Sequence, residues 1–180
     1  MSSILNEYGK DFLGKLVTLP QEKKFTLGLI YINRQSDLFI LFDKMYCTNL
    51  HDVFCNYIQY GVDVITAKRS ISIDMNEVYS AIPDADDYSE TECAYVQNAL
   101  LSIYYLFEFY ITKKNDLFQQ SLDMVLENVD VLSYSVNKSY DENNVFSHEV
   151  EILNDIFSKV ENFSGKISDL IQSEDKLSPF

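Results

Sequence analysis

Two cysteines on either side of a histidine form the first candidate for a reactive site. Cys47, His51 and Cys55 follow one another at intervals of four residues, which on a helix places them along one face. A histidine beside a cysteine can activate the thiol as a nucleophile. Such a row is more often part of core and helix packing, so we expect no catalytic thiol. With Cys93 the cysteines number three and none lies in a C-x-x-C spacing, so we expect buried free thiols in a reducing compartment.

Two other patterns could support catalysis. Glu108 lies in a strongly apolar stretch, where burial could raise the pKa of its carboxyl and make it a general acid. We expect it instead on the exposed edge of a helix. Gly9, Gly14 and Lys15 match the spacing of a phosphate-binding loop, but Leu16 stands where a serine or threonine must meet Mg²⁺. The sequence therefore predicts no nucleotide site and no enzyme.

Metal-binding patterns are incomplete as well. The two histidines, His51 and His148, belong to no H-E-x-x-H motif. Five acids fall within residues 84–92, but Ser89 and Tyr95 occupy the positions where a calcium-binding EF-hand needs glycine and glutamate. We interpret this segment as a solvated loop that begins a helix, because carboxylates are favoured near helix N-termini. We therefore expect no metal and no other cofactor.

Charge is distributed unevenly along the chain. The 180 residues carry a formal net charge of −14. Residues 1–73 hold 7 acids and 8 bases, whereas residues 74–180 hold 21 acids and 6 bases. A field this negative repels nucleic acids and anionic lipid headgroups, and it steers basic partners toward the surface. Such a charge also keeps a protein soluble and monomeric, so by itself it does not demonstrate a binding surface.

The sequence indicates that these residues lie on helices. Glycine numbers 5 and proline 3, too few for the frequent turns of an all-β fold. Apolar residues spaced at 4 and 3 predict two clear seams, and two shorter faces are visible. The seams are Phe118, Leu122, Val125, Val129 and Leu132, and Phe146, Val150, Leu153, Phe157 and Val160; the faces are Phe25, Leu29 and Ile32, and Val53, Tyr57, Tyr60 and Val64.

Capping side chains help to place the helix starts. Asn49, Asp74 and Asn115 each precede an expected helix, and Ser89 with Glu92 forms a capping-box pattern. The expected helices cover residues 4–16, 21–33, about 37–46, 51–68, 75–82, about 90–112, about 115–132 and about 146–160, the last of which can continue to 171. We expect residues 173–180 to fray.

The fold class follows from these helices. Residues 99–111 form the most apolar stretch, but a membrane span takes about 20 residues and this stretch carries Glu108, so we interpret it as a buried core helix. The sequence predicts a single all-α domain over residues 1–180, a compact bundle of about seven or eight helices around the very apolar helix 90–112. Residues 1–14 lack the pattern of a secretory signal, so we expect a cytoplasmic protein.

One segment resembles a known protein family. Residues 81–88 read Ala-Ile-Pro-Asp-Ala-Asp-Asp-Tyr, which resembles the A-I-P-x-A-D-D-(aromatic) motif of the YjaG-like family of bacterial helical proteins, a family with no assigned reaction. The order of the surrounding segments agrees over roughly residues 10–165. The resemblance implies an all-α fold and a cytoplasmic location. It also implies that Asp86 and Asp87 hold the turn at Pro83 and cap the long helix that follows.

The acidic second half and the missing catalytic set predict a non-enzymatic binding protein. Its most concrete form is an immunity protein that binds and neutralises a basic antibacterial toxin, such as a nuclease. A nuclease carries lysines and arginines that hold phosphate, and an acidic inhibitor can mimic that phosphate charge. The expected contact residues are acids of the second half: Asp123, Glu127, Asp130, Asp141, Glu142, Glu149, Glu151, Asp84 and Glu90.

A second hypothesis is a housekeeping or regulatory protein of the cytoplasm that binds a small molecule or forms a homodimer. It would use the tyrosine-rich helices 51–67 and 93–111, because a tyrosine can bury its ring while its hydroxyl stays in water. In both hypotheses we expect the protein to bind neither nucleic acid nor a membrane.

Overall fold

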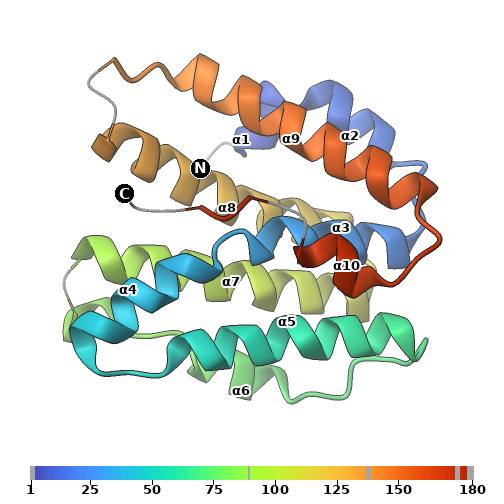
Figure 1. Cartoon of the computed structure of the whole chain (residues 1–180). Helices are drawn as coiled ribbons and strands as arrows, with labels where there is room; N and C mark the ends of the chain where they lie inside the picture. Colours follow the sequence, from blue (N-terminus) through green and yellow to red (C-terminus); the bar gives the residue numbers. More distant parts are fainter. Residues whose placement is uncertain (1–2, 89, 137–138, 173–174, 178–180) are drawn as a thin grey trace.

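The chain folds into helices in this computed structural model, which describes residues 3–88, 90–136, 139–172 and 175–177, and the side chains of these except 85, 90, 91 and 172. Within this part of the chain there are ten α-helices, one 3-10 helix and no β-strand (Figure 1). The bounds are α1 Ile4–Tyr8, α2 Lys10–Leu16, α3 Gln21–Asn33, α4 Ser36–Tyr46, α5 Leu50–Thr66, α6 Met75–Ser80, η1 Ala85–Asp87, α7 Glu90–Thr112, α8 Asn115–Val136, α9 Glu142–Asn162 and α10 Ile167–Gln172. The predicted all-α class is confirmed.

Two long antiparallel helices, α7 and α8, run the length of the bundle (Figure 1). The predicted central helix α7 packs against α3, α4, α5, α6 and α8. Helices α1, α2 and α9 cover one side of the bundle, and α4, α5 and α6 cover the other (Figure 1). The main hydrophobic cluster takes side chains from every α-helix of the described residues. No helix in the described ranges is both long and apolar enough to cross a membrane.

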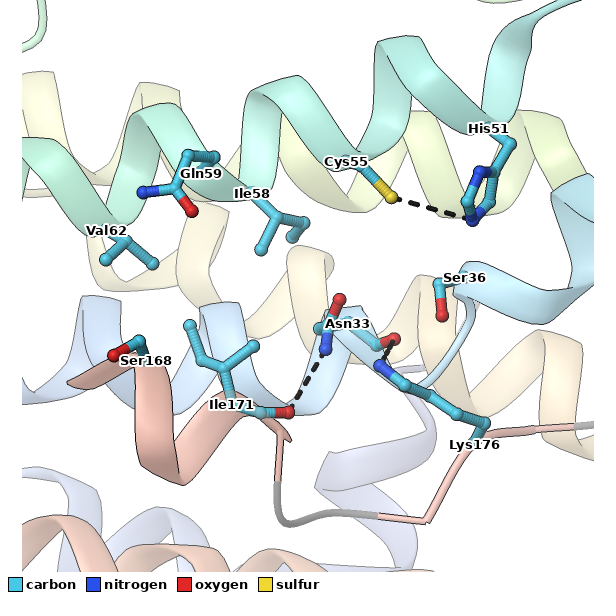
Figure 2. Close-up of a pocket in the computed structure, with 10 residues that line it drawn as sticks. All are labelled: Asn33, Ser36, His51, Cys55, Ile58, Gln59, Val62, Ser168, Ile171 and Lys176. Atoms are coloured by element: carbon cyan, nitrogen blue, oxygen red, sulfur yellow. Dashed lines mark hydrogen bonds between the residues drawn. The ribbon is translucent and has the colours of Figure 1, made fainter. Parts of the chain in front are cut away.

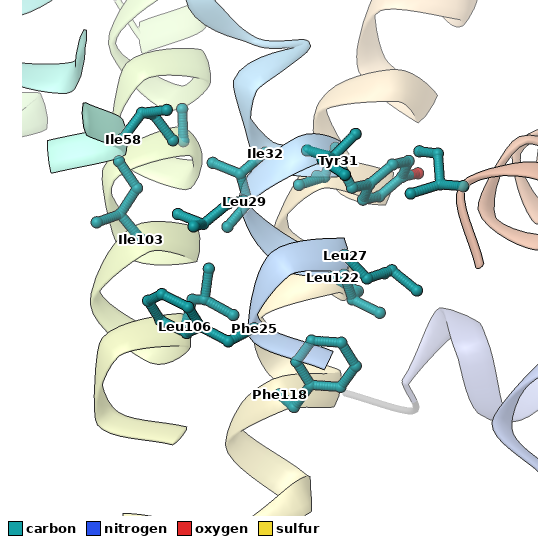
Figure 3. Close-up of a cluster of buried hydrophobic side chains, with 14 of the residues drawn as sticks. Phe25, Leu27, Leu29, Tyr31, Ile32, Ile58, Ile103, Leu106, Phe118 and Leu122 are labelled. Carbon is teal, nitrogen blue, oxygen red and sulfur yellow. The ribbon is translucent and has the colours of Figure 1, made fainter. Parts of the chain in front are cut away.

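The helix that is buried on all sides is α3. Every residue from Lys24 to Asn33 is buried, and α3 contacts α5 and α7 as well as α8, α9 and α10. Figure 3 shows Leu29 and Ile32 beside Ile58 and Ile103, while Tyr31 points the other way. The predicted face of α3 is therefore only part of its buried surface, because a helix surrounded by others buries its whole circumference.

Gly28 allows α3 to lie close to α7 and α8. A Cβ atom placed on Gly28 would lie 2.5 Å from Leu106 Cδ1 and 3.3 Å from Phe118 Cε2. Both of these neighbours are buried in the core (Figure 3), so neither has free space to move into. The packing of α3 between the two long helices thus requires a residue without a side chain at this position.

The predicted seam of α8 is confirmed, since all five of its residues are buried. In α9 four of the five are buried and Val150 is half-buried. The predicted face of α5 is only partly confirmed, because Val64 is buried but Val53, Tyr57 and Tyr60 are half-buried. Its buried residues are Phe54, Ile58, Gly61, Val62 and Val64. Tyr57 and Tyr60 lie half-buried at the edge of that face, where each hydroxyl can keep a polar partner.

Several helix ends differ from the prediction. The expected helix 4–16 is divided into α1 and α2 at Gly9, whose backbone leaves the helical region. The last expected helix ends at Asn162, and α10 is a separate helix. Asn115 lies inside α8 rather than before it, and Ser89 lies outside the described residues.

The start of α5 shows why one predicted cap is wrong. Asp74 caps α6 as predicted, but the side chain of Asn49 makes no capping hydrogen bond to α5. Instead, the carboxylate of Asp43 in α4 accepts hydrogen bonds from the backbone N–H groups of Leu50 at 2.8 Å and His51 at 2.9 Å. The α4–α5 turn brings this carboxylate to the helix start, so the cap comes from the preceding helix.

Candidate functional site

Two of the acids expected to contact a partner are buried. Asp123 is 7 % exposed, and its Oδ1 accepts a hydrogen bond from the backbone N–H of Leu5 at 3.0 Å. Its carboxylate thus lies at the start of α1, where negative charge is favoured. Because α1 covers this part of α8, the prediction that Asp123 forms part of an exposed contact surface is wrong.

Glu149 is 4 % exposed and belongs to a buried network. Its Oε2 lies 2.6 Å from Nη1 of Arg34 and its Oε1 lies 3.1 Å from Nη2, a bidentate ion pair. The hydroxyl of Tyr31 also donates a hydrogen bond to Glu149 at 2.8 Å. Glu149 falls on the inner face of α9 beside Phe146 and Leu153, so it joins helices rather than contacting a partner.

Four of the expected contact acids remain at the surface and also bind the protein itself. Asp141 caps α9, and Asp84 accepts a hydrogen bond from the backbone N–H two residues further on. Asp130 accepts a hydrogen bond from the hydroxyl of Tyr140. Glu142 accepts one from the hydroxyl of Tyr8 at 3.0 Å, although its side chain is exposed. These bonds fix the carboxylates in place while leaving their charge at the surface.

The remaining expected acids differ from one another. Glu127 lines a cavity of about 290 Å³ together with Asp123, and burial followed by the charge of Asp123 raises the pKa of Glu127. The side chain of Glu151 is 82 % exposed, and its Oε2 lies 3.8 Å from Nδ1 of His148. The side chain of Glu90 lies outside the described residues.

The antiparallel helices bring two separate groups of acids to one end of the bundle. In Figure 1, α7 begins at the end where α8 stops and α9 starts. This end therefore carries the acids before α7 and those around the α8–α9 connection. We define the acidic end by six residues: Asp84, Asp86, Asp87, Asp130, Asp141 and Glu142. Lys44, in the last turn of α4, adds one positive charge there.

Two tyrosines at the acidic end have raised pKa values. Burial raises the pKa of Tyr8, and Glu142 and Asp130 raise it further. The pKa of Tyr140 is raised well above its ordinary value by burial, by its hydrogen bond to Asp130, and by the charge of Glu142. Because the same two carboxylates act on both hydroxyls, the charges from α8 and α9 lie close enough to act together.

A second candidate site is a cavity of about 310 Å³ between α5, the α3–α4 junction and α10 (Figure 2). We call it the thiol pocket, and it is lined by Asn33, Ser36, His51, Cys55, Ile58, Gln59, Val62, Ser168, Ile171 and Lys176. Cys55 Sγ lies 3.6 Å from Nε2 of His51. Lys176 closes one side, and its Nζ donates a hydrogen bond to the backbone oxygen of Asn33 at 2.8 Å (Figure 2).

The C-terminal segment is bound against this pocket. The backbone N–H of Leu177 donates to the carbonyl of Arg34 at 2.6 Å, and Nε of Arg34 donates to the carbonyl of Asp175 at 3.2 Å. Residues 175–177 are therefore attached to the α3–α4 junction, contrary to the expected fraying. Residues 173–174 and 178–180 lie outside the described part of the chain.

The cysteines form only part of the predicted row. Cys55 and His51 share the pocket, whereas Cys47 is exposed after α4 with a left-handed backbone (φ 55°) and belongs to a different helix end. The prediction of buried thiols holds for Cys93 alone. Burial raises the pKa of the Cys55 thiol, which keeps it protonated and lowers its nucleophilicity.

The sequence did not single out the other polar residues of the thiol pocket. Asn33, Ser36, Ser168 and Lys176 come from four separate segments and follow no common spacing. Only packing brings them together, so the one sequence signal for this site was the interval between His51 and Cys55. Glu108, the other candidate for catalysis, is half-buried and lies in none of the cavities described above.

The comparisons with known proteins identify no relative. The chain matches no family model, no curated protein and no solved structure. The resemblance of residues 81–88 to the YjaG-like motif thus stays a prediction.

Proposed function

We propose that this protein is a non-enzymatic binding protein whose acidic end takes a basic protein partner. The observation that carries the proposal is that two acidic groups, one before α7 and one around the α8–α9 connection, lie at the same end of the bundle (Figure 1). Carboxylates gathered at one end of a molecule attract and orient a cationic surface and raise its association rate.

The most concrete form of this function is that of an immunity protein. The partner would be a basic toxin domain, such as a nuclease, whose phosphate-binding lysines and arginines face the carboxylates of the acidic end. Three acids suit this role because their carboxylates are already fixed. Asp130 and Glu142 each accept a hydrogen bond from a tyrosine hydroxyl, and Asp141 caps α9. A fixed charge loses less conformational entropy on binding than a mobile one.

The test uses the product of the gene adjacent to this one as the partner. Its affinity for the wild-type chain should fall at least about tenfold in Asp86→Lys/Asp87→Lys, because two attractive charges become repulsive, and it should fall steeply with added salt. Glu161→Lys/Asp169→Lys is the control, since both acids are exposed and lie at the far end of α9 and in α10. A neighbour that is not basic, or equal losses in both variants, would overturn the proposal.

The thiol pocket favours a second candidate function, the binding of a small molecule. It combines an apolar floor of Ile58, Val62 and Ile171 with a few converging polar groups, as ligand sites do. A ligand in this pocket should cover Cys55 and slow its alkylation by iodoacetamide. If a metabolite raises the melting temperature of the protein without slowing that alkylation, it binds elsewhere, and the thiol pocket would be abandoned as its binding site.

A further inference from the structure

Basic side chains surround a surface cavity at the end of the bundle opposite the acidic end. Lys68 and Arg69 follow α5, Lys113 follows α7, and all three line a cavity of about 400 Å³ together with Tyr110 and Gln21. This is the end where α5 and α7 stop and α8 begins (Figure 1). We call it the basic pocket. Because α7 has 23 residues, the two ends lie about 35 Å apart.

The basic pocket carries positive charge in a protein that is acidic overall. The chain has 28 acids and 14 bases, yet neither Lys68, Arg69 nor Lys113 forms an ion pair with an acid of the described residues. Glu22 is the acid on the rim of the pocket, so three positive charges and one negative charge leave a local charge of about +2. Like charges that are held together raise the free energy of the protein, and a bound anion would lower it.

The backbone conformation adds an independent observation. Lys68 has a φ of 49° and Lys113 a φ of 63°, the left-handed region in which a residue after a helix is usually glycine. A side chain in that region costs about 1 kcal/mol. A positive charge near a helix C-terminus is favourable. This effect alone does not explain why the residue with the left-handed backbone is itself a lysine. Both helices nevertheless present an ammonium group to the same cavity from this strained position.

Neighbouring contacts hold the walls of the pocket. The guanidinium of Arg69 lies 5.7 Å from the centre of the Tyr60 ring, which orients it by a cation–π contact. The hydroxyl of Tyr60 in turn accepts the backbone N–H of Ser72 at 2.7 Å. On the other side, Nε2 of Gln21 donates to the carbonyl of Tyr110 at 2.7 Å and joins α3 to the end of α7. The guanidinium of Arg69 and the wall beside Tyr110 are therefore placed before any ligand arrives.

We propose that the basic pocket binds a small soluble anion that carries two or more phosphoryl groups. Arginine and lysine together are the usual ligands of phosphoryl oxygens, and a cavity of about 400 Å³ has the volume of a small-molecule site. The net charge of −14 repels nucleic acids and anionic membranes from the rest of the surface. A small phosphorylated solute can enter the pocket without approaching that surface.

The test is calorimetric titration of the full chain with inorganic pyrophosphate and with ADP. Lys68→Gly/Lys113→Gly removes both ammonium groups and also relieves the left-handed backbone, so it should unfold no earlier than the wild type and bind each probe at least tenfold more weakly. Lys10→Ala/Lys44→Ala removes the same charge from exposed lysines elsewhere and should bind within about twofold of the wild type. Absence of binding to both probes, or equal losses in the two variants, would overturn the proposal.

Two further measurements separate this site from other sources of phosphate and from the acidic end. The protein should bind neither vesicles that contain phosphatidic acid nor, in a separate experiment, a short DNA duplex. If it binds either of these but does not bind pyrophosphate, the proposal is overturned. The variant Asp86→Lys/Asp87→Lys should bind pyrophosphate at least as well as the wild type. Failure of the acidic end to find a partner would therefore leave this result unchanged.

Discussion

At the level of single residues, the acids of the second half divide by what their carboxylates contact. Glu149 and Asp123 bind groups inside the protein, whereas the side chain of Glu151, in the same helix as Glu149, is 82 % exposed. Glu127 is intermediate, because it lines a cavity beside Asp123. These different surroundings give similar carboxylates opposite effects on stability, and two predictions follow from them.

Replacing Glu149 with glutamine should destabilise the fold. Glutamine keeps the shape of the side chain but removes the charge opposite the buried guanidinium of Arg34, and breaking a buried pair from one side costs about 3 kcal/mol or more. Urea unfolding would measure the loss. Glu151→Gln is the matched control, and it should change the free energy of unfolding by less than about 0.5 kcal/mol. Equal effects of the two substitutions would show that the buried pair is not required.

Replacing Glu127 with glutamine should stabilise the protein at neutral pH. Burial and Asp123 raise the pKa of Glu127, so the folded state holds its proton more tightly than the unfolded chain does. The carboxyl therefore lowers stability as the pH rises from its ordinary pKa of about 4.3 through the raised value. The gain at pH 7 should be at most about 1 kcal/mol, because water screens a half-exposed charge. Urea unfolding between about pH 4 and 7 would measure it, and a gain that persists at pH 4 would contradict this cause.

At the level of secondary-structure elements, the position of α3 determines how the long helices meet. Helix α3 lies between α7 on one side and α8 and α9 on the other, and its close approach depends on the absence of a side chain at Gly28. Gly14 provides a contrast, since a Cβ atom there would meet nothing within 4 Å.

The same substitution should therefore have opposite effects at these two glycines. Gly28→Ala should destabilise the protein by about 1–3 kcal/mol, because the new methyl group overlaps the buried Leu106. Gly14→Ala, on the exposed side of α2, should stabilise it by about 0.5–1 kcal/mol, because alanine loses less entropy in a helix. Thermal unfolding of both variants would show the signs. A Gly28→Ala variant as stable as the wild type would mean that α3 can shift.

At the level of the whole molecule, the antiparallel arrangement separates charge. The acidic end collects carboxylates from segments more than forty residues apart, and the basic pocket collects lysines and an arginine from the opposite ends of the helices. Ion pairs between lysine or arginine and an acid are few in the described residues, namely Arg34 with Glu149 and Lys159 with Asp155. Within this part of the chain, carboxylates far outnumber the ion pairs that neutralise them.

Salt should stabilise the protein for this reason. Raising sodium chloride from about 20 to about 300 mM shortens the screening length from roughly 20 Å to roughly 6 Å and weakens the mutual repulsion of the carboxylates. The midpoint of thermal unfolding at pH 7 should rise by a few degrees. Near the isoelectric point of about 4.4, where the net charge vanishes, the same salt should have little effect. A midpoint that falls with salt at pH 7 would show that attractive ion pairs outweigh the repulsion.

The sequence predicted the fold well where the signal is local. The period of the apolar residues located α3 and α8 and the seam of α8, since that period depends on residues within a few turns of one helix. It was less reliable for α5, whose buried face depends on its four neighbours α3, α4, α7 and α10, and for the cap from Asp43, which comes from another helix. For the thiol pocket, the sequence showed the interval between His51 and Cys55, but it did not show that Lys176 lies beside them.

Sequence alone thus determined that this chain is helical, acidic in its second half and poor in catalytic patterns, because composition and periodicity are properties of short stretches. Which of these acids are buried and which are exposed depends on how the helices pack. Glu149 and Glu151 are chemically alike and two residues apart, yet one is paired with Arg34 inside the bundle and the other is in water. That difference depends on the side of α9 that faces the core, which is decided by packing between helices distant in the sequence.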